Sequence, residues 1–118
     1  MQHGAEHPDV ALGMNNLGNV YRSMRQTELA RSLYLRALAI RERLLGNDHP
    51  DVGTTLKNLA ELYRDEGRDS AAQPLYQRAI TILENAVGAG HPEVAETRAS
   101  YVRLPAVRIA PAERPRDN

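Results

Sequence analysis

The residues of this 118-residue chain best suited to metal or acid–base chemistry are its histidines. His7, His49 and His91 each precede a proline and are spaced 42 residues apart. Zinc needs its ligands about 2 Å from one centre, whereas neighbouring repeats of packed helices are about 10 Å apart. The spacing therefore argues against a metal site. We expect each of these histidines to end a loop, where it caps or packs against the helix that follows.

The sequence offers no group of residues typical of a catalytic or phosphate-binding site. Its serines lack plausible His and Asp partners for nucleophilic catalysis. Gly88 and Gly90 follow a predicted helix, whereas a phosphate-binding loop opens a helix after a strand. Asp65 and Glu66 are adjacent and would face apart on a helix. We therefore predict that the chain is not an enzyme and uses no cofactor or metal.

Amide and charged residues recur instead along one side of two predicted helices, opposite their apolar positions. An asparagine amide both donates and accepts hydrogen bonds, so it can hold the backbone of an extended peptide whatever its side chains. Arg22, Lys57 and Arg64 could add charge-assisted bonds to acidic side chains. The alternative is a polar face that contacts only water. The candidate peptide-binding residues are Asn15, Asn16, Asn19, Arg22, Lys57, Asn58, Glu61 and Arg64.

The composition narrows the range of partners and compartments. Basic and acidic residues balance at 15 each, so no overall field draws the chain to nucleic acid or lipid. No apolar run approaches the roughly 18 residues of a membrane span, and no basic-then-apolar leader opens the sequence. The chain has no Cys, which fits a reducing compartment. We expect a cytoplasmic protein with no nucleic-acid and no membrane partner.

The motif His-Pro-Asp-Val organises the rest of the chain. It occurs at 7–10 and 49–52, and a near copy, His-Pro-Glu-Val, occurs at 91–94. A fixed period of this length is typical of a solenoid, in which each repeat packs only against its neighbours. The core must be built from Leu, Ala, Ile, Val and Tyr, because the chain has no Phe or Trp.

The period divides the chain into two complete repeats, a partial third repeat and two terminal segments. The first segment is either the tail of a preceding repeat or disordered. The last is rich in Pro and Arg and is expected to be extended or disordered. The segments are 1–6, 7–48 (first repeat), 49–90 (second repeat), 91–104 (partial third repeat) and 105–118 (tail).

Apolar residues at spacings of three and four predict two helices in each complete repeat and one in the partial repeat. Thr27 and Asp69 are predicted to be N-caps. Gly46 is predicted to end a helix in a left-handed conformation. The inward residues of the first helix are expected to be Val10, Met14, Leu17, Val20, Tyr21 and Met24. The predicted helices span about 9–24, 27–45, 51–66, 69–87 and 93–103.

Aligning 7–48 on 49–90 gives identical residues at 16 of 42 positions. The period alone would also allow HEAT or armadillo helices. However, small residues lie where two helices would cross closely, and tyrosines lie where they would fill gaps between repeats. The residues of this pattern are Leu17, Gly18, Tyr21, Ala30, Tyr34 and Ala37, and then Leu59, Ala60, Tyr63, Ala72, Tyr76 and Ala79. The pattern resembles the tetratricopeptide repeat (TPR), and its period and Gly-x-x-His-Pro-Asp-Val connection are similar to the repeats of kinesin light chains and nephrocystin.

The resemblance implies an all-α TPR solenoid with two complete helical hairpins, a fifth capping helix and a disordered tail. It also implies that the first helix of each repeat lines a concave groove, and that Asn16 and Asn58 correspond to peptide-holding asparagines. We therefore expect a scaffold for protein–protein interaction that binds an extended peptide in this groove, with an acidic peptide as one option. The sequence does not predict a groove for the acidic C-terminal tails of heat-shock chaperones. Asn15, Glu96 and Ser100 stand in place of the cations that hold such tails in other TPR proteins.

The alternative function is a structural module that self-associates through its open repeat ends. It would be a homo-oligomer or part of a longer TPR array. The partial repeat has no second helix, so Tyr101, Val102 and Leu104 are expected to be exposed at that end. A more distant alternative is an accessory domain of a larger enzyme.

Overall fold

The computed structural model describes residues 7–105, which form five α-helices. Each helix begins and ends within one residue of the bounds that apolar spacing predicts. Residues 1–6 and 106–118, with the predicted end of a preceding repeat and most of the predicted tail, lie outside the described residues. The helices are α1 (Pro8–Ser23), α2 (Thr27–Leu45), α3 (Pro50–Asp65), α4 (Asp69–Val87) and α5 (Pro92–Val102).

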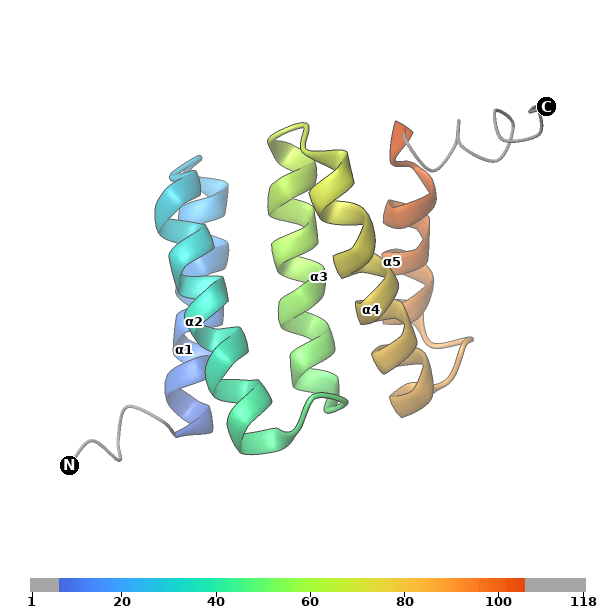
Figure 1. The fold of residues 1–118 in the computed structure, drawn as a ribbon, viewed down its shortest axis with the longest axis horizontal. Coiled ribbons are helices and arrows are strands. Elements are labelled where there is room, and N and C mark those ends of the chain that lie inside the picture. Colours follow the sequence, from blue (N-terminus) through green and yellow to red (C-terminus); the bar gives the residue numbers. More distant parts are fainter. Residues whose placement is uncertain (1–6, 106–118) are drawn as a thin grey trace.

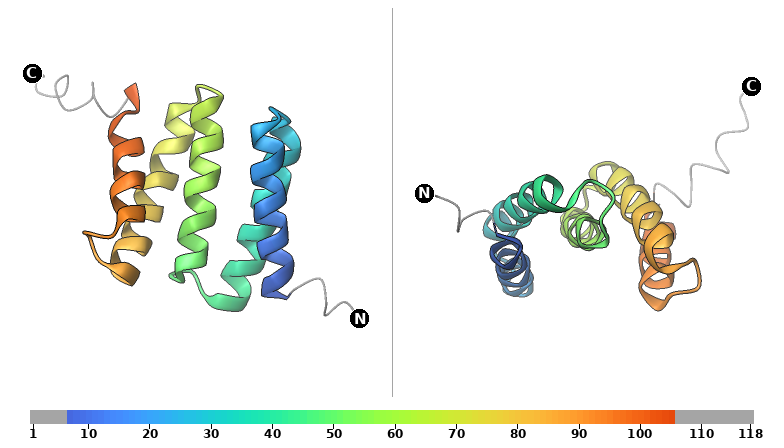
Figure 2. Two further views of the ribbon diagram at one scale, coloured as in Figure 1. Left: turned by 180° about the vertical axis from the view of Figure 1, so that it is seen from behind. Right: turned by 90° about the horizontal axis from the view of Figure 1, so that it is seen from below.

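The helices stack in sequence order and form an arch. α1 and α2 make one hairpin, α3 and α4 make a second, and α5 packs against α4 (Figure 1). Seen from below, α1, α3 and α5 lie on the inner side of the arch, and α2 and α4 lie on the outer side (Figure 2). The expected all-α solenoid of two hairpins and a fifth helix is therefore confirmed. We call the surface of α1, α3 and α5 inside the arch the inner surface.

The helices on the inner side of the arch begin in the same way. In α1, the Nδ1 atom of His7 accepts a hydrogen bond of 3.0 Å from the backbone N–H of Asp9. His49 and His91 repeat this contact at 3.0 and 3.1 Å. The proline after each His has no N–H to satisfy, and the acid after it lies at the positive end of the helix dipole. The histidines are thus N-caps, as their position before each helix indicates.

The predicted N-caps of the outer helices are wrong. Thr27 and Asp69 are the first residues of α2 and α4, and the N-cap positions belong to Gln26 and Arg68, whose side chains make no capping bond. The backbone of the preceding turn explains the difference. Arg25, with φ of 62°, is in the left-handed region, and the N–H of Gln26 donates to the carbonyl of Tyr21 at 2.8 Å. This backbone bond closes the turn before α2, and α2 begins without a side-chain cap.

Glycines end the two outer helices. Gly46 has φ of 94° and ψ of 156°, and Gly88 has φ of 92° and ψ of 152°. The positive φ of Gly46 is as predicted, but ψ of both glycines is extended instead of helical. Only glycine adopts this conformation readily, and it turns the chain away from the helix axis toward the next His-Pro.

Small residues allow the two helices of each hairpin to cross closely. A Cβ atom added to Gly18 of α1 would lie 2.7 Å from Cε1 of Tyr34 in α2, which is closer than real contacts allow. Ala30 and Ala72 are fully buried. The Tyr34 ring therefore packs directly against α1, where its hydroxyl donates to Asn19.

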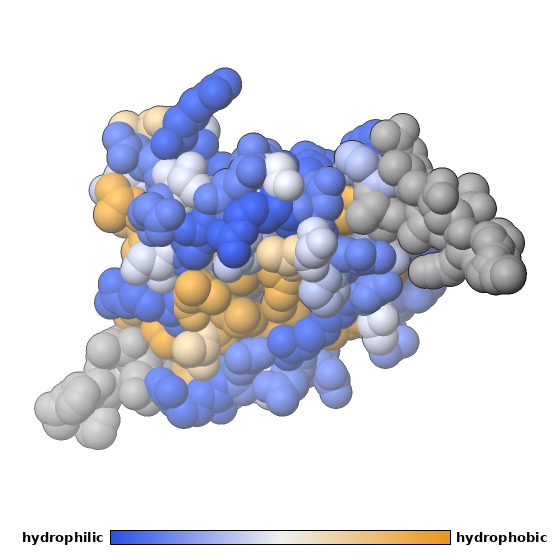
Figure 3. All heavy atoms as spheres, turned by 45° about the horizontal axis from the view of Figure 1, so that its top comes forward, coloured by the Kyte–Doolittle hydropathy of each residue, from blue (hydrophilic) through white to orange (hydrophobic). Residues whose placement is uncertain are grey.

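α3 lies at the centre of the fold and joins the two repeats. Val52, Leu56 and Ile82 form a core cluster between α3 and α4, and Leu38 of α2 and Leu75 of α4 pack against it while only partly buried. Apolar side chains accordingly gather on the outer surface over α2 and beside it (Figure 3). In this strip, side chains of the outer helices pack against α3 and remain partly exposed.

A buried arginine adds a polar contact between α2 and α3. Arg41 is only 5% exposed, and its Nη1 atom donates to Thr55 Oγ1 at 2.8 Å and to the Asp51 carbonyl at 3.1 Å. Burial lowers the pKa of Arg41. Because a buried donor without an acceptor is costly, these bonds fix how α2 seats on the start of α3.

The inward face predicted for the first helix is wrong in part. The buried residues of α1 are Ala11, Asn15 and Gly18. Three residues of the predicted inward set are well exposed, namely Leu17 (44%), Val20 (50%) and Met24 (57%). Their counterparts Leu59 and Leu62, 42 residues later, are 2% and 1% exposed because α2 covers them. The apolar stripe on α1 is thus exposed, because no helix among residues 7–105 covers it as α2 covers α3.

The C-terminal end differs from expectation at Leu104. Leu104 is fully buried and packs in a cluster with Ala60, Ala72 and Tyr76. The chain turns at the end of α5, where the N–H of Leu104 donates to the carbonyl of Tyr101 at 3.1 Å, and the side chain packs against α3 and α4 instead of facing solvent. Val102 is 48% exposed, as expected.

Candidate functional site

The eight candidate peptide-binding residues all lie on α1 and α3, which form two of the three helices of the inner surface (Figure 2). The repeat brings residues of the two helices together in pairs. Their surroundings differ, because some are exposed and others are used to join the two helices.

Asn15 and Asn58 bond to each other. Nδ2 of Asn58 donates to Oδ1 of Asn15 at 3.0 Å, and the residues are only 5% and 8% exposed. Their expected place on an open face is therefore wrong. The amide pair links α1 to α3 at the floor of the inner surface. The exposed amides are those of Asn16 and Asn19.

Arg22 is paired with two acids of α3. Its Nε and Nη2 atoms donate to the two carboxylate oxygens of Asp65 at 2.6 and 3.2 Å, and Nη1 donates to Glu61 Oε1 at 3.2 Å. The hydrogen bond with Asp65 is the main cause that raises the pKa of Arg22, and burial opposes it. Such a bidentate pair is geometrically specific. It holds α1 against α3 and neutralises much of the charge of Arg22 and Glu61.

Lys57 and Arg64, the other two candidate cations, differ in whether an acid lies beside them. Nζ of Lys57 lies 3.5 Å from Oε2 of Glu93 in α5, and that oxygen also accepts from Thr54 Oγ1 at 3.2 Å. Arg64 is half-buried and forms no ion pair with any of residues 7–105. Of the three candidate cations, Arg64 alone is without a neutralising acid in the described part of the chain.

Two buried tyrosines of the outer helices pack against the helices of the inner surface, and sequence reasoning did not select them. Tyr34 OH donates to Asn19 Oδ1 at 2.5 Å. Tyr76 OH is buried and has no hydrogen-bond partner among residues 7–105. Burial raises the pKa of each tyrosine to about 12. The available signal was the small residue on the facing helix, which lets a tyrosine of the outer helix pass through.

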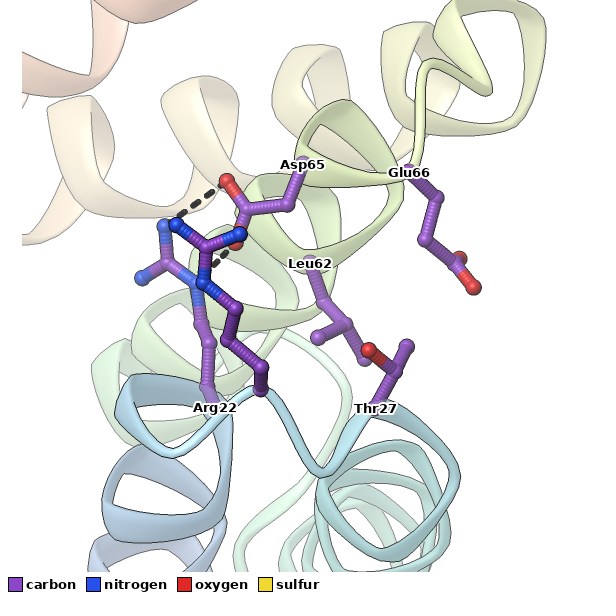
Figure 4. Close-up of a pocket in the computed structure, with 6 residues that line it drawn as sticks. Arg22, Thr27, Leu62, Asp65 and Glu66 are labelled. Atoms are coloured by element: carbon purple, nitrogen blue, oxygen red, sulfur yellow. Dashed lines mark hydrogen bonds and ion pairs between the residues drawn. The ribbon is translucent and has the colours of Figure 1, made fainter.

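A pocket of about 440 Å³ lies where the first turn meets the end of α3 (Figure 4). Arg22 and Asp65 form their ion pair on one side of it, and Leu62 supplies an apolar patch. Opposite charges on its walls compensate each other, so its charge selects neither an anion nor a cation. The lining residues are Arg22, Arg25, Thr27, Leu62, Asp65 and Glu66.

Two kinds of site are absent from residues 7–105. No group of three or more His, Cys, Asp or Glu side chains there could hold a metal ion. Within the same range, no helix is both long and apolar enough to cross a membrane.

Solved structures of the same fold come from kinesin light chain-type proteins. The TPR-like repeats of a putative kinesin light chain from Podosopora anserina are 22% identical with a TM-score of 0.72, over 83% of this chain and 46% of that one. BtubC (BKLC) from P. vanneervenii is 24% identical with a TM-score of 0.71, over 99% of this chain and 54% of its own. The present chain thus spans about half the length of these structures.

Comparison with curated proteins gave no match. The family model of the tetratricopeptide repeat matches residues 9–85, which is more than half of the chain. The helical hairpins, the small residues at their crossings and the inter-repeat tyrosines agree with that match. The chain belongs to the tetratricopeptide repeat family.

Proposed function

We propose that the inner surface binds an extended peptide segment of a partner protein. TPR repeats generally mediate protein–protein interaction. The observation that carries the proposal is the row of amide and cationic side chains across α1 and α3, several of which are fixed by bonds between the helices. Side chains held in place before binding lose little conformational entropy on binding, which favours affinity.

The exposed amides and the unpaired cation would make the contacts. Asn16 can donate to and accept from the peptide backbone, and Arg64 can bond an acidic group. Asn15 and Asn58 would act indirectly, by setting the distance between α1 and α3. Neither role involves a chemical step, so we propose a binding scaffold without catalytic activity. The absence of Cys fits a cytoplasmic location, and the balanced charge does not favour nucleic acid.

Selection from a displayed random peptide library, followed by titration of the selected peptide, tests this function. Asn16→Ala should weaken binding several-fold, because the amide that meets the backbone is removed, while the melting temperature stays unchanged. Asn85→Ala is the matched control, since Asn85 is an exposed asparagine on the outer helix α4. Equal binding by the wild type and both variants would contradict a role for Asn16 in the groove.

We propose self-association through the N-terminal face as a second function, because one observation favours it. Leu17, Val20 and Met24 are about half exposed, while Leu59 and Leu62 in the equivalent places are buried by α2. The helix that would cover this face resembles α2, whether it comes from another chain or from a further repeat. Sedimentation at rising concentration, with a Leu17→Lys variant beside the wild type, tests it.

A further inference from the structure

The histidine caps of α1, α3 and α5 share a requirement that depends on protons. In each cap, Nδ1 accepts a hydrogen bond from a backbone N–H, so this nitrogen carries no proton of its own. The histidine side chain changes charge between about pH 5 and 8, and a proton on Nδ1 turns the acceptor into a donor. The charged ring would also lie at the positive end of the helix dipole. Mild acid therefore opposes all three capping bonds.

In the first two caps, a carboxylate is in place to compensate. Oδ2 of Asp9 lies 3.6 Å from Nδ1 of His7, and Oδ2 of Asp51 lies 3.9 Å from Nδ1 of His49. Neither carboxylate is bonded to another side chain of residues 7–105, since Arg41 of the neighbouring helix α2 contacts the carbonyl of Asp51. A protonated ring can turn its Nδ1–H to this carboxylate. The new ion pair then replaces the lost capping bond.

The third cap differs because its acid already has partners on another helix. Oε2 of Glu93 accepts from Thr54 Oγ1 at 3.2 Å and lies 3.5 Å from Nζ of Lys57, and both partners belong to α3. The third motif has Glu where the first two have Asp, and the longer side chain reaches α3. No ion pair joins His91 to an acid of residues 7–105. Protonation of His91 is therefore uncompensated unless Glu93 leaves α3.

The surroundings of His91 on α4 supply no substitute, and α5 itself is short. The N–H of His91 donates to the carbonyl of Gly88 at 3.2 Å, and Glu84, one turn before Gly88, is bonded to Arg98 at 2.7 Å. α5 has 11 residues, against 16 in α1 and in α3. A short helix has few internal hydrogen bonds to offset the cost of ordering it, so it depends more on its cap.

We propose that the attachment of α5 to α3 is sensitive to pH, and that protonation of His91 loosens it while α1 and α3 stay in place. Two routes lead to this result. If Glu93 stays with Lys57, the cap of α5 is lost. If Glu93 turns to the charged ring, Lys57 and Thr54 lose their acceptor. Because α5 is one of the three helices of the inner surface, mild acid loosens that surface at its C-terminal end, whether or not a peptide is bound.

Hydrogen–deuterium exchange of the full chain, read by mass spectrometry at about pH 7.5 and about pH 5.5, tests the attachment across the range in which histidine titrates. Protection factors, which are corrected for the effect of pH on intrinsic exchange, are compared for the amides of α1, α3 and α5. Loss of an N-cap shifts a local opening equilibrium by about fivefold. Protection of α5 should therefore fall by about fivefold at the lower pH, and protection of α1 and α3 should fall less.

Two variants identify the group that titrates. Asn caps helices well and carries no titratable group, so His91→Asn should abolish the fall in α5. His7→Asn is the matched control, because it makes the same change in the cap of α1 and should leave the response of α5 as in the wild type. Constant protection of α5 in the wild type would overturn the proposal. A fall that persists in His91→Asn, or an equal fall in all three helices, would overturn it as well.

Discussion

At the scale of single residues, two tyrosines in equivalent positions differ by one hydrogen bond. Tyr34 OH donates to Asn19, and Tyr76 OH has no partner among residues 7–105. A satisfied buried bond contributes about 0.5–1.5 kcal/mol, whereas a buried unmet hydroxyl costs stability. Tyr34→Phe should lower the free energy of unfolding by about 1 kcal/mol, and Tyr76→Phe should leave it unchanged or raise it. Urea unfolding measures both, and a clear loss in Tyr76→Phe would show that its hydroxyl has an acceptor.

The buried amide pair gives a second prediction at this scale. Asn58→Ala leaves Oδ1 of Asn15 without its donor in a nearly closed site. The expected loss of unfolding free energy is about 1–3 kcal/mol, whereas the exposed Asn16→Ala should stay within about 0.5 kcal/mol. Denaturant unfolding of the two variants compares them. Equal, small effects would mean that the amide pair does not hold α1 to α3.

The chemical types of the inner-surface residues could be read from the sequence, but their partners could not. Asn and Arg at helical spacing identified the polar side of α1 and α3. Arg22 could contact a ligand or Asp65, which lies 43 residues later in the sequence. Which contact forms depends on how closely the second repeat packs against the first, and the sequence does not give that distance. The surroundings of the Tyr76 hydroxyl could not be predicted for the same reason, because they depend on how α4 packs against α3 and α5.

At the scale of the helices, the crossing of α1 and α2 depends on one missing methyl group. A Cβ atom on Gly18 would lie 2.7 Å from the Tyr34 ring, whereas one on Gly13 would meet nothing within 4 Å. Gly18→Ala should therefore destabilise the fold by about 1–3 kcal/mol through overpacking. Gly13→Ala in the same helix should stabilise it by about 0.5–1 kcal/mol, since Ala favours a helix. Thermal unfolding tests the pair, and equal shifts would contradict a close crossing.

The bounds of the helices were predictable because the signals are local. Each His-Pro begins an inner helix, and each Gly after an apolar stretch ends an outer one. The faces were less predictable, because Val20 and Leu62 read alike in the sequence although one is exposed and the other buried. The difference lies in the presence of a preceding helix. The N-caps failed because the turn at Arg25 closes through its own backbone.

At the scale of the whole molecule, a solenoid is stabilised mainly by contacts between neighbouring repeats. The exposed side chains of Leu17 and Val20 leave the N-terminal face without such a neighbour among residues 7–105. Burying apolar surface is favourable by about 25 cal/mol per Å², so the apparent mass should rise with concentration. Light scattering from about 1 to 500 μM measures it, a range that spans weak association on the usual affinity scale.

A double variant, Leu17→Lys with Val20→Lys, separates this face from others. Both residues are exposed, so charges there should leave the helix folded while opposing contact with another chain. The variant is expected to stay monomeric at concentrations where the wild type gains mass. A wild type that remains monomeric over the whole range would refute the open face as an association surface.

In mechanical terms, the arch is a short curved beam. Ion pairs such as Arg22 with Asp65 and Lys57 with Glu93 join its inner helices, and the ion pair of Arg78 with Glu42 joins the outer helices α4 and α2. Exposed ion pairs weaken as salt is added, but apolar contacts do not. Salt should thus loosen the inner side most between α1 and α3, where Arg22 contacts two acids, and the beam should straighten there. We expect small-angle X-ray scattering to show a greater end-to-end length at high ionic strength, and hence a changed curvature for a segment bound inside the arch.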